Sequence, residues 1–300
     1  MKISIITVSC NANRVIEACL RSVASQTYKN VEHVVIDGLS ADGTVDTARR
    51  FPHVTTLVSE RDDGIYDAMN KGLRRVTGDY VLFLNADDTL RSRTTLAETV
   101  AAIEKDPGAD VYYGALEVRP LAGAPFVFRP PPPAEAPEFM ICGCLPHQST
   151  LARPSVFAKT CGFDVRYRYH ADYDWFLKIL ADTTIEVRMV SNVIGSFQEG
   201  GASSHLAAGQ PEVYAIQNAA PLYATPEWDK QRIHSLQQAL LRERVETSRL
   251  KEMIRVDPGK LRYRYRISTI IRRRVPRTML DAARAIRDKY LTVAAGWTRR

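Results

Sequence analysis

The sequence lacks any run of about 20 apolar residues, the length that a helix needs to span a bilayer, so no transmembrane helix is expected. The apolar run near the start is short and ends in Asn11, Asn13 and Arg14 without a small-residue cleavage site, which favours a core strand over a signal peptide. Internal repeats and recognisable nucleic-acid-binding modules are also lacking. These absences predict a cytoplasmic protein with no nucleic-acid partner.

Cysteine is scarce, with five residues at positions 10, 19, 142, 144 and 161. An odd number at irregular spacing is typical of a reducing compartment rather than of a disulfide framework. Cys142, Cys144 and His147 raise the question of a zinc site. Only one residue separates the two cysteines, whereas zinc sites usually have Cys-x2-Cys or wider spacing, so a metal site there is not favoured.

Charge is distributed unevenly along the 300 residues. Residues 251–300 contain 15 Lys and Arg against 4 Asp and Glu, a balance of +11. Because the whole chain carries +7, the first 250 residues carry −4. The chain therefore combines a mildly acidic body with a strongly basic tail, and each has its own interpretation.

Two kinds of segment alternate over much of the chain: near-continuous apolar runs and segments with apolar residues at helical spacing. The apolar runs predict strands at 2–9, 31–38, 54–60, 79–88 and 109–119, and the periodic segments predict helices at 14–26, 40–51, 64–76, 94–106 and 169–182. This alternation is typical of an α/β fold in which a mostly parallel sheet carries helices on both faces. Ligands of such folds bind at the carboxyl ends of the strands, where Asp37, Glu60 and Asp87 fall.

Two adjacent carboxylates, Asp87 and Asp88, end the apolar run that begins at Tyr80. One interpretation is a solvated loop in which Asp88 caps the helix that follows. The other is a divalent cation held by one carboxylate, with phosphate oxygens of a ligand and water completing its coordination. Spacing alone leaves both interpretations open.

Five segments, in this order, resemble family 2 glycosyltransferases of the GT-A fold: "ISIITVSCNA", "VVIDGLSADGT", "SERDDGIYDAMNKGL", "GDYVLFLNADD" and "HADYDWFLKI". The resemblance covers residues 2–205. Within it, the segments are similar to those of bacterial enzymes that build colanic-acid-type exopolysaccharide. It implies a Rossmann-like GT-A fold. It also implies metal-dependent transfer of a sugar, with inversion, from a nucleotide diphosphate sugar to a saccharide or lipid-linked saccharide acceptor. Surface polysaccharide or glycolipid synthesis is the implied setting.

The resemblance also implies roles for individual residues. Asp87 matches the metal-binding carboxylate, and Mn²⁺ or Mg²⁺ is the implied cofactor. Asp172 matches the catalytic base, which takes the proton of the acceptor hydroxyl. Asn85 stands where the family's Asp-x-Asp element usually has its first Asp. The residues implied for the nucleotide sugar are Cys10, Asn11, Asp37, Glu60, Asp62, Asp63, Asn85 and Ala86.

Two positions depart from a simple match or admit a second interpretation. Gly38 stands where many relatives have the second carboxylate of an Asp-Asp pair, which weakens the expectation that Asp37 reads the nucleotide base. Asp174 lies two residues after Asp172, so the two point in different directions on a helix. Asp174 can instead be a charge that interacts with the positive end of the helix dipole.

The resemblance implies that His147 lies near the acceptor. It also implies a loop whose Gly201 and Ser203 approach the donor phosphates. A structural histidine is the alternative for His147. Two other functions compete with glycosyl transfer: nucleotidyl transfer and non-catalytic binding of a sugar nucleotide by a membrane scaffold. The first normally shows a Gly-rich basic loop after the first strand, which is lacking here, and the second needs no base at Asp172.

A GT-A domain is expected at 1–210 and a helical, basic extension at 211–300, with one long helix at 231–254. Residues 251–300 interleave cations with aromatic and aliphatic residues, as do segments that lie on an anionic membrane surface. Nucleic-acid binding and a solvated or partner-binding helix are the alternatives. Because an enzyme with lipid-linked acceptors benefits from residence at the membrane, we expect a peripheral position on the inner face of the cell membrane.

Overall fold

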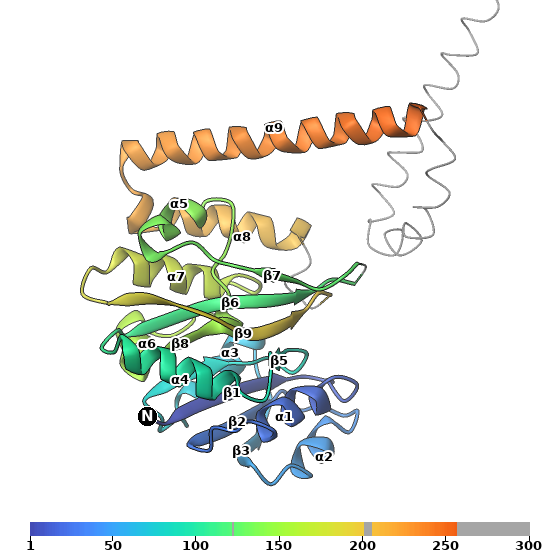
Figure 1. Ribbon diagram of the computed structural model, residues 1–300, viewed down its shortest axis with the longest axis vertical. Helices are drawn as coiled ribbons and strands as arrows, with labels where there is room; N and C mark the ends of the chain where they lie inside the picture. Colours follow the sequence, from blue (N-terminus) through green and yellow to red (C-terminus); the bar gives the residue numbers. More distant parts are fainter. Residues whose placement is uncertain (122, 201–205, 257–300) are drawn as a thin grey trace, which may run out of the picture. The chain divides into compact units, whose positions relative to one another are not determined.

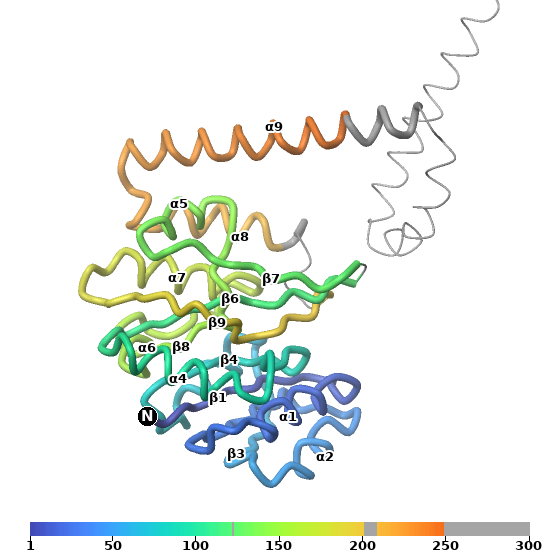
Figure 2. The backbone as a smooth tube through the Cα atoms, in the orientation of Figure 1, coloured from blue at the N-terminus to red at the C-terminus, as the bar shows by residue number. Residues whose placement is uncertain are grey.

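The computed structural model describes residues 1–121, 123–200 and 206–256 (Figure 1, Figure 2). The strands are β1 (Ile3–Ser9), β2 (Val31–Asp37), β3 (Val54–Ser59), β4 (Tyr80–Phe83), β5 (Thr89–Leu90), β6 (Val111–Arg119), β7 (Phe126–Phe128), β8 (Thr150–Ala152) and β9 (Val187–Gln198). The α-helices are α1 (Ile16–Ala24), α2 (Thr44–Arg49), α3 (Ile65–Leu73), α4 (Thr95–Lys105), α5 (Ala136–Phe139), α6 (Pro154–Thr160), α7 (Ala171–Ala181), α8 (Leu206–Ala219) and α9 (Pro226–Val256). Short 3-10 turns are η1 (Pro133–Glu135), η2 (His147–Ser149) and η4 (Pro221–Tyr223).

The strands form one sheet in the order β3-β2-β1-β4-β8-β6-β9-β5, and β7 pairs with β6. β1 pairs in parallel with β2 and β4, and β2 pairs in parallel with β3. β8 is antiparallel to β4 and β6, whereas β9 runs parallel to β6. The register makes Ser9, Asp37 and Ser59 neighbours, so three carboxyl ends meet at one edge. The predicted α/β class is confirmed; the antiparallel pairs around β8 are a feature that the apolar patterns did not reveal.

Helices cover both faces of the sheet because strand residues alternate between two hydrophobic clusters (Figure 1). In β1, Ile3 and Ile5 belong to the cluster that includes residues of α1 and α4. Ile6 and Val8 belong to the cluster that includes residues of α3 and α7. Each of these four side chains is at most 5% exposed, so the near-continuous apolar run reflects burial on both sides.

The turn after β4 rules out one interpretation of Asp88. The helix that follows, α4, begins at Thr95, and its N-cap is Thr94. Strand β5 lies between Asp88 and this helix in the sequence. It pairs with β9 as the outermost strand of the sheet, so the chain continues as a strand before the helix starts. Asp88 therefore does not cap the helix and is not solvated, since it is 0% exposed.

The chain divides into two compact units, 1–239 and 240–300. Within the first unit, Glu212 of α8 accepts hydrogen bonds from the backbone N–H groups of Arg168, Tyr169 and His170. These three residues lead directly into α7, so the carboxylate holds the segment that precedes the helix, near the positive end of the helix dipole. The predicted domain boundary at residue 210 stays a prediction.

Helix α9 is continuous over Pro226–Val256, which confirms the long helix predicted for 231–254. Among the described residues, no helix combines the length and the apolar character that crossing a bilayer requires. Residues 257–300, which hold most of the basic tail, lie outside the described residues.

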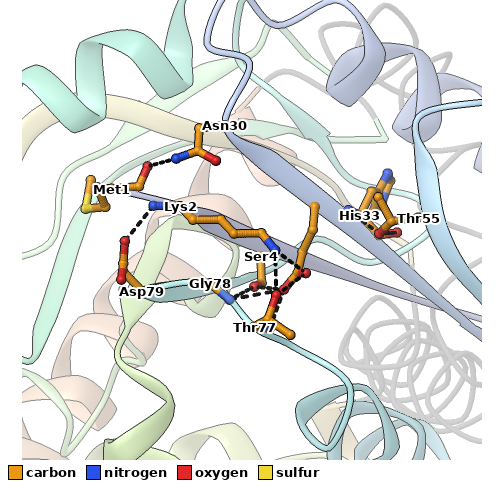
Figure 3. A network of polar contacts seen from close by, with 10 residues as sticks. Met1, Lys2, Ser4, Asn30, His33, Thr55, Thr77, Gly78 and Asp79 are labelled. Atoms are coloured by element: carbon orange, nitrogen blue, oxygen red, sulfur yellow. Dashed lines mark hydrogen bonds and ion pairs between the residues drawn. The ribbon is translucent and has the colours of Figure 1, made fainter.

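A polar network ties the amino ends of the central strands together, at the end of the sheet opposite the carboxyl edge. Its centre is the carboxylate of Glu32 at the start of β2, only 8% exposed. Lys2 Nζ donates to Glu32 Oε2 at 2.8 Å, the Thr77 hydroxyl donates to the same oxygen at 2.7 Å, and the backbone N–H of Gly78 reaches Oε1 at 3.1 Å. Ser4 also donates to Oε1. Figure 3 shows these four donors side by side.

Replacing Glu32 with Gln is expected to lower the free energy of unfolding by about 2–4 kcal/mol, because several buried donors lose a charged acceptor. Burial alone would raise the pKa of Glu32, but the bonds from Lys2, Ser4 and Thr77 lower it to about 2. The stabilisation is therefore complete above the unfolded-state pKa and is lost as the pH falls toward 2. Urea unfolding at pH 7 and pH 3 measures both effects. Glu17→Gln, at an exposed i,i+4 ion pair, is the control and should change little.

Candidate active site

A cavity of about 490 Å³ lies at the carboxyl edge of the parallel strands. It is bounded by the loop after β1, the turn after β4, the turn η2 and the start of α7. Of the residues predicted from the sequence, it is lined by Cys10, Asn11, Asn85, Ala86, Asp87, His147 and Asp172. Segments that lie far apart in the chain, such as those that hold Cys10 and Asp172, thus converge here, as expected for the carboxyl ends of the strands in an α/β sheet.

Asp37 is not among the lining residues. It is 0% exposed, and its two carboxylate oxygens accept hydrogen bonds from the hydroxyls of Ser9, Ser40 and Ser59 and from the backbone N–H of Ser40. These donors come from the ends of β1 and β3 and from the loop after β2. The carboxylate thus joins three strand ends next to the cavity, which Ser9 lines.

Asp62 occupies the space that Gly38 leaves open. A side-chain carbon at position 38 would collide with the Asp62 carboxylate, so the glycine is required for this close approach. Asp62 Oδ1 accepts the backbone N–H of Gly64 at 3.0 Å, which fixes the carboxylate over the end of β2. The charge of Asp62 also helps to raise the pKa of the Cys10 thiol, after burial as the main cause. A carboxylate is thus present near position 38, supplied by a later loop.

The other predicted residues do not line this cavity, and two of them lie outside the described residues. Glu60 forms an ion pair with Lys71 at 3.6 Å. Asp63 lines a second, neighbouring cavity of about 350 Å³, and its backbone N–H donates to Asp67. Gly201 and Ser203 lie outside the described residues.

The Asp172 carboxylate is the centre of a hydrogen-bond network. His147 Nδ1 lies 2.9 Å from Asp172 Oδ2, and the hydroxyl of Tyr66 donates to Oδ1 at 2.7 Å. The other imidazole nitrogen, Nε2, lies 3.3 Å from Asn85 Nδ2. When the amide of Asn85 donates to Nε2, the imidazole is neutral and its hydrogen is on Nδ1, so His147 can donate to Asp172.

Asp174 takes no part in this network. Its carboxylate pairs with Lys178 at 2.7 Å along α7, at i,i+4 spacing. The two aspartates therefore point in different directions, as predicted, and Asp172 is the one that lines the cavity.

The network shifts the pKa of both members of the His147–Asp172 pair. Burial alone would raise the pKa of Asp172, but the hydrogen bond and charge of His147 and the bond from Tyr66 outweigh it and lower the pKa. Burial alone would lower the pKa of His147, and the hydrogen bond and charge of Asp172 outweigh it and raise the pKa. Asp172 is therefore ionised at neutral pH, the state in which a carboxylate can accept a proton.

An Asp172→Asn variant is expected to lower the pKa of His147 below its usual value near 6.5, because burial, the largest cause, is then opposed only by the charges of Asp87 and Asp88. The stabilisation that His147 gains in the wild type is present below the unfolded-state pKa and is lost as the pH rises through the higher folded-state pKa. NMR titration of ¹³C-labelled histidines, with His147→Gln to assign the signal, measures the shift. An unchanged pKa in Asp172→Asn would contradict the pairing.

Asp87 and Asp88 are in contrasting positions. Asp87 lines the cavity, and burial raises its pKa, although its own backbone N–H and the charges of His147 and Arg119 oppose the shift. Asp88 lies behind it; burial and the charge of Asp87 raise the pKa of Asp88 to about 7. Neither oxygen of Asp88 has a hydrogen-bond partner of good geometry, although the Gln198 N–H and Gln148 amide are close enough to lower its pKa slightly.

The donor set fits a hard divalent cation that brings most of its own ligands. No three or more His, Cys, Asp or Glu side chains gather as a metal site in the part of the chain that the structure describes. Mg²⁺ and Mn²⁺ need only one or two protein carboxylates when phosphate oxygens and water complete the coordination. Asp87, facing the cavity with the unsatisfied carboxylate of Asp88 behind it, meets that requirement.

The sequence reasoning missed one residue that lines the cavity and one cation near it. Tyr66 lies within the quoted segment "SERDDGIYDAMNKGL", but nothing in its spacing indicates a contact with Asp172, 106 residues away. Arg119, at the end of β6, is near enough to lower the pKa of Asp87, and its Nε is buried without a hydrogen-bond partner. A cation at a strand end facing an acidic turn is the signal that could have pointed to it.

Comparison with known proteins assigns the chain to a family. The sequence profile described as "Glycosyl transferase family 2" matches residues 4–129. A "PGL/p-HBAD biosynthesis glycosyltransferase" of Mycobacterium bovis is 34% identical over 206 residues, which are 67% of this chain and 78% of that protein. The chain belongs to glycosyltransferase family 2. An uncharacterised glycosyltransferase of Haemophilus influenzae is 28% identical over 185 residues, covering 60% of this chain and 62% of that protein.

Solved structures support the GT-A fold of this family 2 glycosyltransferase. Staphylococcus aureus TarS 1-349 in complex with UDP-GlcNAc superimposes with a TM-score of 0.60 at 18% identity, covering 74% of this chain and 68% of that chain. The mannosyltransferase PcManGT from Pyrobaculum calidifontis, in complex with GDP-Man and Mn²⁺, gives 0.55 at 19% identity, covering 80% and 75%. The predicted family, fold and enzyme class are confirmed.

Proposed function

We propose that this glycosyltransferase moves a sugar, with inversion, from a nucleotide diphosphate sugar to a hydroxyl of a saccharide or lipid-linked saccharide. The observation that carries the proposal is the Asp172 carboxylate. It is ionised, held by His147 and Tyr66, and faces the same cavity as Asp87. A protein that only binds sugar nucleotides has no use for a base held in this way.

The proposed chemistry needs one proton acceptor. The O–H bond of the acceptor breaks, its proton goes to a carboxylate oxygen of Asp172, and its electron pair forms the bond to the anomeric carbon. The bond from that carbon to the nucleotide diphosphate breaks on the opposite face, which inverts the configuration. His147 and Tyr66 keep the carboxylate ionised until the proton arrives.

The donor is proposed to lie along the carboxyl edge. The nucleoside would lie against Cys10 and Asn11, within reach of the Asp62 carboxylate above Gly38. In place of direct contact, Asp37 is proposed to hold the strand ends that shape this pocket. Asp87 would hold Mn²⁺ or Mg²⁺, which when bound neutralises charge on the leaving diphosphate. The complexes of TarS with UDP-GlcNAc and of PcManGT with GDP-Man and Mn²⁺ support a donor of this class.

The decisive experiment is nucleotide release from UDP-, GDP- and dTDP-sugars with Mn²⁺, with Mg²⁺ and with EDTA. We expect slow, metal-dependent release from one nucleotide class, because water replaces the missing acceptor. Isothermal calorimetry with the same sugars and metals measures binding independently of turnover. Failure of every donor to bind, with or without metal, would overturn the proposal and favour a scaffold.

The acceptor is proposed to be presented at a membrane surface, to which the basic residues 251–300 attach the protein. Synthesis of a surface glycolipid or polysaccharide is the proposed setting, and a relative named as a "PGL/p-HBAD biosynthesis glycosyltransferase" supports a role in a biosynthetic pathway.

The full chain is expected to sediment with vesicles that contain about one-third phosphatidylserine and to be released by 0.5 M salt, because each cation near the surface contributes about 1 kcal/mol. Vesicles of phosphatidylcholine alone are the control. A chain that lacks 251–300 should remain in the supernatant. Equal sedimentation of the two chains would show that the tail is not the attachment.

A further inference from the structure

The hydroxyl of Tyr66 lies within hydrogen-bond distance of two acceptors but can donate its hydrogen to only one of them. Its side chain is buried, with the residue 6% exposed, and its hydroxyl oxygen lies 2.7 Å from Asp172 Oδ1 and 2.9 Å from the backbone carbonyl oxygen of Tyr169. Both neighbours are acceptors, but a phenol carries one hydrogen. Only one of the two acceptors, the carboxylate or the neutral carbonyl, can therefore receive the hydrogen bond at a time.

The charge on Asp172 determines which acceptor receives the hydrogen bond from Tyr66. A hydrogen bond to an ionised acceptor is roughly twice as strong as one to a neutral acceptor, so the hydrogen points to Asp172 while the carboxylate is charged. Once Asp172 has taken a proton, it is neutral and a weaker acceptor. The Tyr66 hydroxyl can then rotate about its C–O bond toward the carbonyl of Tyr169 without moving its ring. The hydrogen stays on Tyr66 throughout, so no covalent bond changes there.

We propose that Tyr66 is a positioning residue for the catalytic base: it holds the Asp172 carboxylate before proton uptake and turns its hydroxyl to Tyr169 afterwards. This inference rests on the proposed function, in which Asp172 takes the acceptor proton. The residue does not compete as a base, because burial and the nearby Asp172 charge raise the pKa of its own hydroxyl well above the usual value.

Tyr66→Phe removes none of the other titratable groups around Asp172. They are His147 from η2, His170 before α7 and the thiol of Cys144, whose pKa is raised by burial and then by Asp172. Of these, only the two histidines can carry positive charge. A change in the titration of Asp172 after Tyr66→Phe is therefore assignable to the lost hydrogen bond.

The test is the pH dependence of nucleotide release from UDP-GlcNAc and from GDP-mannose with Mn²⁺, in wild type and Tyr66→Phe. Loss of a donor to the carboxylate raises the pKa of Asp172, so the acid limb of kcat should move up by about one pH unit. At pH 7, where Asp172 is ionised in both proteins, kcat should still fall about tenfold because the carboxylate is held by one donor fewer, with the KM of the donor unchanged. Tyr80→Phe is the matched control, because it removes a buried hydroxyl that donates to the carbonyl of Ala109 at 2.7 Å.

A second readout needs no substrate. In Tyr66→Phe the carboxylate has lost one donor and becomes a stronger partner for His147, so the imidazole pKa should rise, whereas Tyr80→Phe should leave it unchanged. If neither the acid limb nor the His147 pKa moves, Tyr66 only packs against α7 and the inference is wrong. If the His147 pKa moves but no donor releases nucleotide in wild type, the proposed function fails, and with it the catalytic part of this inference.

Discussion

Asp172→Asn is expected to lower kcat for sugar transfer by about 10²- to 10⁴-fold, the usual contribution of a general base. The amide is nearly the same size as the carboxylate, so the cavity keeps its shape, but it has no basic oxygen for the acceptor proton. Donor binding should persist, because no predicted nucleotide contact is removed. Steady-state rates of nucleotide release with the preferred donor and Mn²⁺, combined with calorimetric donor affinity, separate the two effects.

Asp174→Asn is the matched control for this substitution. It removes the same charge from the same helix two residues away. There the carboxylate pairs with Lys178 and does not line the cavity. Its rate should stay within about twofold of wild type, since the pair, with Asp174 15% and Lys178 38% exposed, makes no contact with the groups that hold Asp172, and its loss acts on the stability of α7. If the two variants lost activity equally, the effect would belong to the stability of α7, and Asp172 would not be the base.

The fold could be predicted from residues that lie close together in the sequence. The apolar runs of β1, β2 and β4 and the helical spacing in α1 and α3 are local patterns, and the alternation of the two predicts a parallel sheet covered on both faces. The pairing of β8 between β4 and β6 is not local. β8 is only three residues long, too short to give a pattern of its own.

Position at a strand end is sufficient to place some of the predicted site residues beside the cavity, while their roles stay predictions. Asp87 and Asn85 follow β4 and do line the cavity. Asp37 also ends a strand, but the hydroxyls of Ser9 and Ser59 from neighbouring strands surround it, and only the register shows that they meet. The same holds for Asp62, which fills the space beside Gly38 from a separate loop.

Asp87→Asn is expected to remove metal-stimulated nucleotide release, with a loss of about 10²-fold or more in kcat, because the diphosphate leaves without its charge neutralised. The predicted signature is loss of response to the cation. Activity of the wild type should rise with Mn²⁺ and fall with EDTA, whereas the variant should show the same low rate with either. Asp46→Asn on the surface of α2, where the carboxylate is 81% exposed, is the control and should respond as wild type.

The same substitution should stabilise the metal-free protein, which separates a functional carboxylate from a structural one. Burial raises the pKa of Asp87, and the charge of Asp87 adds to the burial that raises the pKa of Asp88 to about 7. A raised carboxyl pKa means that folding loses stability as the pH rises above the unfolded-state value. Removing the Asp87 charge should therefore raise the free energy of unfolding at pH 7.5 by about 1 kcal/mol. Mn²⁺ with the nucleoside diphosphate that the preferred donor releases should raise the melting temperature of wild type only. A variant that is less stable than wild type and still responds to Mn²⁺ would show that Asp87 belongs to the framework and that the cation is held elsewhere.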